Sequence, residues 1–101
     1  MRHKNLYSNQ DPHHLYEIID KIDGDTFKYG ISWEPIGADG LSGRMRKQVN
    51  LFNQIDDWER FFARIILSNI QGKEEAKRIE TAYIKAYEKM NGRKPRGNIK
   101  Y

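Results

Sequence analysis

Two short runs of aromatic and β-branched residues, 14–21 and 26–32, flank the dipeptide Asp23-Gly24. Aspartate and glycine tolerate the backbone angles of a tight turn, so this pattern favours a β-hairpin. A two-stranded hairpin is only marginally stable in water and needs a third strand or a covering helix. The hairpin therefore restricts the chain to folds that contain a small antiparallel sheet, which later segments must complete.

The length of the hairpin loop decides which side chains share a face of the sheet. A two-residue loop, 23–24, pairs residue 16 with 31 and places Tyr16 and Lys28 on opposite faces. A three-residue loop, 22–24, pairs residue 16 with 30 and 18 with 28, which places Tyr16, Lys28 and Gly30 on one face. We favour the second register, because glycine at the third loop position suits a type I turn followed by a bulge.

The middle of the chain predicts a loop, a helix and a third strand. Residues 33–43 contain three Gly and one Pro and are typical of a loop. Ser42 is a suitable N-cap for a short amphipathic helix that ends near Asn53. The segment that follows fits either a strand over 62–68 or a helix over 57–68, and the hairpin's need for a third strand favours the strand.

A second helix is predicted over 73–90, and Asn91-Gly92 supplies its stop. Lys73 and Lys77 are expected to face away from its apolar stripe. The predicted fold class is therefore α+β, with a small three-stranded antiparallel sheet flanked by helices. The stripe is formed by Ala76, Ile79, Tyr83, Ala86, Tyr87 and Met90.

Composition limits the chain to one small domain. The 101 residues suffice for a single core, and we interpret the polar segment 1–12 as a leader or linker before a domain at 13–101. No window approaches the roughly 20 apolar residues of a membrane span, and the start has no apolar run typical of a signal peptide. The absence of cysteine excludes disulfides and thiolate metal sites.

The net charge is +4, and the basic residues are clustered. Residues 89–101 contain five basic residues and no acid, and residues 44–47 contain three more without an acid. Such clusters favour a polyanionic partner, although a solvated surface with a basic tail fits the charge equally well.

Three residues stand out as candidates for chemistry. Glu80 falls on the core-facing side of the second helix, where a carboxylate is costly unless it is paired or binds a cation. A Glu at the edge of the stripe that reaches solvent or an Arg is the simpler alternative. Arg44 lies near the start of the first helix, a position that suits a phosphate, although Arg46 competes for this role and both could be solvated. Tyr16, taken alone, is typical of a strand residue that packs in the core.

The order of these features resembles the GIY-YIG nuclease superfamily, and more narrowly the URI-type nuclease domains at the C-termini of bacterial polymorphic toxins. The segment 14–16 stands at the superfamily's Gly-Ile-Tyr motif, and 28–30 stands at its Tyr-Ile-Gly motif, with Lys28 in place of the tyrosine. Arg44 followed by an apolar residue, Glu80, and Asn98 near the C-terminus complete the resemblance, which covers nearly the whole chain.

The resemblance implies a metal-dependent endonuclease. Glu80 would hold Mg²⁺ or Mn²⁺, Arg44 would stabilise the charge that develops on the phosphate, and Tyr16 would act as general base. Lys28 would lower the pKa of Tyr16 or hold the phosphate. We expect further contacts with nucleic acid from Tyr29, Arg46, Lys47, Arg96 and Asn98.

By the same resemblance, the domain would be the toxic tip of a larger exported protein. It would act in the cytoplasm of a target cell, with DNA favoured over RNA as substrate, and a cognate immunity protein would neutralise it in the producer. Two other functions stay open. The first is a nucleic-acid-binding module without catalysis, and the second is a protein-interaction domain whose acidic partner contacts the basic tail.

Overall fold

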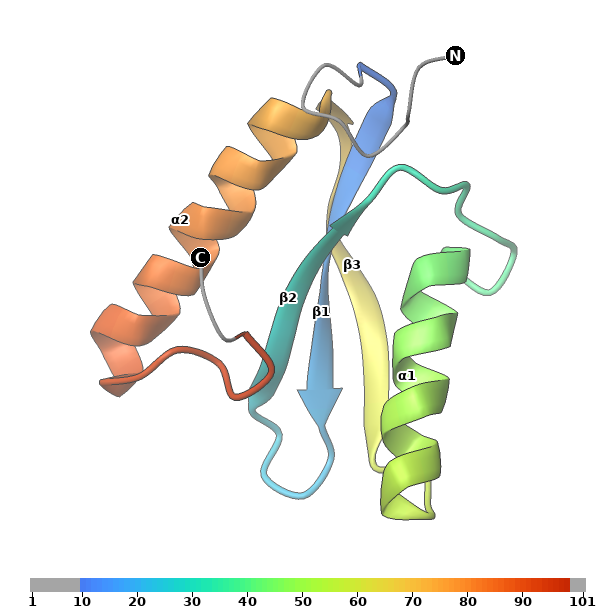
Figure 1. Cartoon of the computed structure of the whole chain (residues 1–101), viewed down its shortest axis with the longest axis vertical. Coiled ribbons are helices and arrows are strands. Elements are labelled where there is room, and N and C mark those ends of the chain that lie inside the picture. The colour runs from blue at the N-terminus through green and yellow to red at the C-terminus, as the bar shows by residue number, and fades with distance from the viewer. Residues whose placement is uncertain (1–9, 99–101) are drawn as a thin grey trace.

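The computed structural model describes residues 10–98 and contains a three-stranded antiparallel sheet with two helices (Figure 1). This confirms the predicted α+β fold class. Most of the predicted leader lies outside the described residues, and Pro12 is already the first residue of a strand. The elements in chain order are β1 (Pro12–Asp20), β2 (Thr26–Ser32), α1 (Gly43–Asp56), β3 (Phe61–Gln71) and α2 (Lys73–Asn91).

The sheet has the order β2-β1-β3, so the hairpin's first strand is central. Tyr16 pairs with Gly30 and Ile18 with Lys28, which confirms the favoured register. The predicted three-residue loop is wrong, however, because β1 ends at Asp20 and β2 begins at Thr26. Next to the loop, Ile19 pairs with Thr26, which is one residue out of the predicted register. A bulge between Ile18 and Ile19 then shifts the pairing by one residue, so that Ile18 pairs with Lys28 as predicted.

The third strand is confirmed and is longer than predicted, since β3 pairs with β1 from Phe61 to Gln71. The alternative helix over 57–68 is wrong, because the hydrogen bonds that β1 offers on its second edge outweigh a helical pattern in this segment. The helix predicted to end near Asn53 continues to Asp56, where Asp57 adopts the left-handed conformation.

Each helix covers one face of the sheet (Figure 1). Tyr16 and Ile18 pack with Met45 of α1 on one face, whereas Leu15 packs with Ala76 of α2 on the other. This division follows from the alternation of side chains along β1, which is buried on both faces.

The buried face of α2 differs in part from the predicted stripe. Ala76 and Tyr87 are buried as predicted, but Ala86 and Met90 are exposed, and Ile84 is buried instead. The buried residues, Ala76, Glu80, Ile84 and Tyr87, form one stripe along the whole helix, and this stripe is rotated from the predicted one toward Glu80 and Ile84. Glu80 lies on the buried side, as predicted, and Gly92 ends the helix in the left-handed conformation.

Candidate functional site

A cleft of about 670 Å³ opens at the outer edge of β2, between the first turn of α1 and the N-terminal half of α2. It brings together three of the four predicted catalytic residues, which come from three elements: Lys28 from β2, Arg44 from α1 and Glu80 from α2. Gly97 and Asn98 of the C-terminal segment form part of its wall. Residues far apart in the sequence therefore meet at one place.

Glu80 is nearly buried in the wall of this cleft, with 7% of its surface exposed. Its carboxylate accepts a hydrogen bond from the ammonium of Lys77, with 2.8 Å between Nζ and Oε1. Lys77 and Lys73 are not part of the core, in line with the prediction, but they also line the cleft beside Glu80, which was not predicted from the sequence. Helical spacing could have found them, since residues 73, 77 and 80 share one side of a helix.

Four cations line the cleft together with Glu80, and burial lowers the pKa of two of them, Lys28 and Lys73. Burial lowers the pKa of Lys28, the Arg44 guanidinium lowers it further, and Glu80 opposes the change. Burial also lowers the pKa of Lys73, with Arg44 and Lys77 adding to the effect. Lys28, Arg44, Lys73 and Lys77 outnumber the two acids on the cleft wall, Glu80 and Glu34. A bound anion would relieve this repulsion.

Tyr16, the fourth predicted catalytic residue, is fully buried and does not line the cleft; its ring packs against Gly30, which does. Its hydroxyl donates a hydrogen bond to Gln48 Oε1 at 2.8 Å, a partner that the sequence did not suggest. Burial raises the pKa of Tyr16, and the neighbouring Arg44 guanidinium opposes this change. In the structure, the phenol is therefore held in its neutral form and away from solvent.

The contact between Gly30 and Tyr16 explains on steric grounds why position 30 is a glycine. A Cβ atom on Gly30 would lie 2.3 Å from Cζ of Tyr16 and 2.4 Å from its hydroxyl oxygen. Real carbon atoms do not approach so closely, so any side chain at position 30 would displace the ring. Gly30 thus provides the space that the Tyr16 ring fills across the β1–β2 pair.

Tyr29 and Asn98, both predicted to bind nucleic acid, line the cleft and also contact each other, and their binding to nucleic acid stays a prediction. The Tyr29 ring packs edge-to-face on Tyr83, with 5.6 Å between ring centroids. The Asn98 amide accepts from Tyr29 N–H at 2.8 Å and donates to its carbonyl at 3.0 Å. Gly97 N–H adds a bond to the Phe27 carbonyl at 2.7 Å. The C-terminal segment therefore covers the outer edge of β2 and forms part of the cleft wall.

Two other predicted contacts are held by ion pairs. Arg46 binds Asp39 through two hydrogen bonds of 2.9 and 2.8 Å and also donates to the Leu41 carbonyl. Arg96 contacts Asp23 at 3.0 Å, whereas Lys47 is exposed. Binding of nucleic acid by Arg46, Lys47 and Arg96 stays a prediction, and Arg46 and Arg96 also have structural partners.

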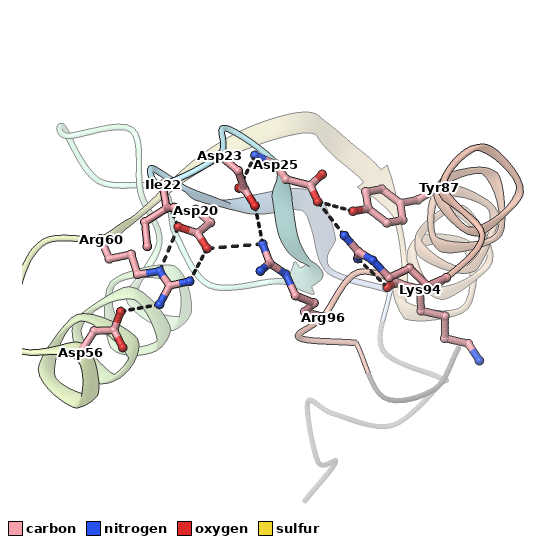
Figure 2. A network of polar contacts seen from close by, with 10 residues as sticks. Asp20, Ile22, Asp23, Asp25, Asp56, Arg60, Tyr87, Lys94 and Arg96 are labelled. Atoms are coloured by element: carbon pink, nitrogen blue, oxygen red, sulfur yellow. Dashed lines mark hydrogen bonds and ion pairs between the residues drawn. The ribbon is translucent and has the colours of Figure 1, made fainter.

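Figure 2 shows a polar network at the other end of the sheet, around the β1–β2 turn. Asp20 is fully buried and receives two hydrogen bonds from Arg60, at 2.9 and 2.7 Å. Asp25 accepts from the Tyr87 hydroxyl at 2.6 Å and from Arg93 at 3.1 Å. With Arg96, these contacts tie the turn to the α1–β3 connection, to α2 and to the C-terminal segment.

Residues 10–98 lack a membrane-spanning helix and a cluster of metal ligands. No helix in this range is long and apolar enough to cross a membrane. The same residues contain no group of three or more His, Cys, Asp or Glu side chains placed to hold a metal ion. A metal in the cleft would therefore have few protein ligands.

Comparison with known proteins gives one match. The family model described as URI fold toxin 2 matches residues 6–92, which is most of the chain and includes the elements that form the cleft. No curated protein and no solved structure matched the chain. On the extent of the family match, the chain belongs to the URI fold toxin 2 family.

Proposed function

We propose that this toxin domain is a metal-dependent endonuclease that hydrolyses phosphodiester bonds, with DNA as the favoured substrate. The observation that carries the proposal is the cleft itself, where one nearly buried carboxylate lies among four cations. An excess of positive charge suits a phosphodiester, and a carboxylate is a ligand for a hard divalent cation. The arrangement also supports assigning the domain to the GIY-YIG superfamily, from which it departs at Lys28.

The donor set of the cleft fits Mg²⁺ or Mn²⁺ bound by a single residue, Glu80. Mg²⁺ keeps several waters and commonly needs only one or two carboxylates together with substrate phosphates, so the small number of acids is no obstacle. The Lys77 ammonium that pairs with Glu80 would have to share the carboxylate or move. When bound, such an ion would polarise the phosphoryl oxygens of the substrate.

The cationic side chains of the cleft would bind and orient the phosphate of the substrate. Arg44 can bind two oxygens of one phosphate with its planar guanidinium. Lys28 adds a half-buried charge on the same face as Tyr16, which would draw the substrate toward the phenol. Tyr16 is buried and bonded to Gln48, so its proposed role as general base requires a nearby positive charge, such as the Arg44 guanidinium, to lower its pKa when substrate binds.

Membership of the toxin family supports two further proposals, about the larger protein that carries the domain and about its inhibitor. The domain would be the C-terminal part of a larger exported bacterial toxin that acts in the cytoplasm of a target cell. A cognate immunity protein would protect the producer, and the cationic cleft predicts that an inhibitor which covers it is acidic.

Relaxation of a supercoiled plasmid tests the nuclease proposal. We expect nicked and linear products with Mg²⁺ or Mn²⁺ and none after addition of EDTA. Products that form equally well in EDTA would contradict metal dependence. Salt-sensitive binding without cleavage in any divalent metal would instead favour a non-catalytic nucleic-acid-binding module, which the burial of Tyr16 would then explain.

A further inference from the structure

A second, smaller hollow of about 240 Å³ adjoins the cleft. The two cavities share three wall residues, His13, Trp33 and Glu34. The hollow lies at the end of the sheet where β1 begins and where β2 and β3 end, since its wall includes Pro12 and Asn69. Trp33 directly follows the last residue of β2 and lines both cavities.

The wall of the hollow has the chemistry of a nucleobase site. Trp33, Pro35 and Ile36 offer flat or apolar surfaces, against which the face of a base can stack. Ser68 and Asn69 add a hydroxyl and an amide, the groups that bind the polar edges of bases. The cationic cleft next to it suits the phosphate, so the two cavities together match a nucleotide rather than a phosphate alone.

Asn69 has a backbone feature that fits this interpretation. It adopts a left-handed conformation with a φ of 56°, one of two non-glycine residues with positive φ among those described. Asparagine tolerates this conformation better than most residues, and such positions are often found at functional sites. Asn69 is exposed near the end of β3 and forms part of the wall of the hollow.

We propose that the hollow beside Trp33 takes an unpaired base from the strand whose phosphate lies in the cleft, so that the domain prefers single-stranded or locally unpaired nucleic acid to duplex. A base in a duplex has its faces stacked and its edge paired, so it cannot enter a side pocket unless it leaves the helix. This inference rests on the proposed function for its biological setting, but it concerns binding and can be tested without cleavage.

The binding test uses protein that carries Glu80→Gln, in EDTA, with a single-stranded DNA oligonucleotide and its duplex as probes. Trp33→Ala should weaken binding of the single strand by roughly 5- to 150-fold, the range for loss of one base–aromatic stack, and should change duplex binding little. Trp58→Ala is the matched control, because Trp58 lies in the α1–β3 connection outside both cavities. It should leave both affinities unchanged.

Tryptophan fluorescence gives a second readout of the same contact. In a Trp58→Phe background, Trp33 is the remaining tryptophan, and stacking of a base should quench its emission. We expect quenching by the single strand and not by a strand with an abasic site in place of the stacked base. An RNA strand of the same sequence shows whether the site distinguishes the two sugars.

Equal affinity for single strand and duplex, unchanged binding by Trp33→Ala, or no binding of either probe would overturn the base site. The nuclease proposal fails separately, if wild-type protein cleaves no nucleic acid in Mg²⁺ or Mn²⁺. If the protein cleaves paired and unpaired DNA at the same rate and Trp33→Ala has no effect, the nuclease proposal is supported and the proposed base-binding site is contradicted.

Discussion

At the scale of single residues, Tyr16 and Gly30 form a matched pair across two strands. The ring of Tyr16 occupies the volume that a side chain at position 30 would need. Asp23-Gly24 predicts a hairpin here, but its register agrees with the prediction only because the bulge between Ile18 and Ile19 compensates for the longer loop. The fit of ring against glycine, and the bond from Tyr16 to Gln48, could not be predicted, since they depend on where α1 packs.

Gly30→Ala should destabilise the domain, because the new methyl group would overlap the buried Tyr16 ring. Overpacking of a core costs about 1–3 kcal/mol, and this contact is close enough to reach the upper part of that range. Urea unfolding followed by circular dichroism measures the loss.

Tyr16→Leu provides the control for this change. A leucine side chain is shorter than tyrosine and does not reach the region of Cζ, so Gly30→Ala should cost less in this background than in the wild type. An equal cost in both backgrounds would show that the ring is not the cause.

At the scale of elements, the two edges of the sheet differ. The outer edge of β2 is covered by Gly97 and Asn98, which bond to its backbone, whereas β3 forms the opposite edge. An unpaired strand edge can associate with strands of other chains, so this cover protects the outer edge of β2. From the sequence, Asn98 was expected only in a turn or in contact with substrate. A single side-chain amide that bonds to a strand backbone, as a neighbouring strand would, produces no periodic sequence pattern.

Asn98→Ala should lower the free energy of unfolding by about 1–3 kcal/mol, because it leaves both backbone groups of Tyr29 without their amide partner. Nuclease activity should fall with it, since Lys28 and Gly30 flank Tyr29 in the cleft. Asn50→Ala, at an exposed position of α1, is the control and should change stability by less than about 0.5 kcal/mol. Equal effects of the two substitutions would contradict the role of the amide.

The strand β3 shows how tertiary pairing overrides a local pattern. Its sequence fits a helix nearly as well as a strand, and the deciding fact is that β1 needs a partner on its second edge. The bulge near Ile18 was missed for a similar reason, since local turn chemistry does not report a shift in pairing further along the strands.

At the scale of the whole molecule, the distribution of charge differs from the one that the sequence suggested. The basic C-terminal segment looked free to bind a polyanion, but Arg93 and Arg96 pair with acids of the β1–β2 turn. These acids are more than 65 residues away in the chain, so the ion pairs could not be predicted from the residues next to Arg93 and Arg96. The positive charge that faces a cavity is instead gathered around Glu80.

Asp20 should make the stability of the domain depend on pH in acid. The hydrogen bonds from Arg60 hold the pKa of Asp20 below its usual value, so its contribution is present above about pH 4 and is lost as the pH falls through the folded-state pKa. Asp20→Asn should therefore destabilise the domain near neutral pH, and its difference from the wild type should narrow as the pH falls. Urea titrations at several pH values measure this.

The control for Asp20 is Asp57→Asn, at an exposed position where the left-handed backbone also suits asparagine. This variant should follow the wild-type pH dependence. A constant difference between Asp20→Asn and the wild type at every pH would show that the ion pair does not depend on ionisation of Asp20.

The cleft should also control how nucleic-acid binding depends on salt. Lys73→Gln removes one cation from its wall, and we expect the slope of log affinity against log salt to fall by about 1. Lys89→Gln, an exposed position near the C-terminal end of α2, should leave the slope unchanged. Fluorescence anisotropy in EDTA measures both, and a larger change for Lys89→Gln would place the binding surface elsewhere.

The most direct test of the account compares single-turnover plasmid cleavage in Mg²⁺ by Glu80→Gln and Glu74→Gln. The two residues lie on the same helix, but Glu80 is nearly buried in the cleft and Glu74 is exposed. We predict that Glu80→Gln lowers the rate by about a hundredfold or more while the protein stays folded, and that Glu74→Gln keeps the wild-type rate. A folded Glu80→Gln variant that cleaves as fast as the wild type would contradict the account.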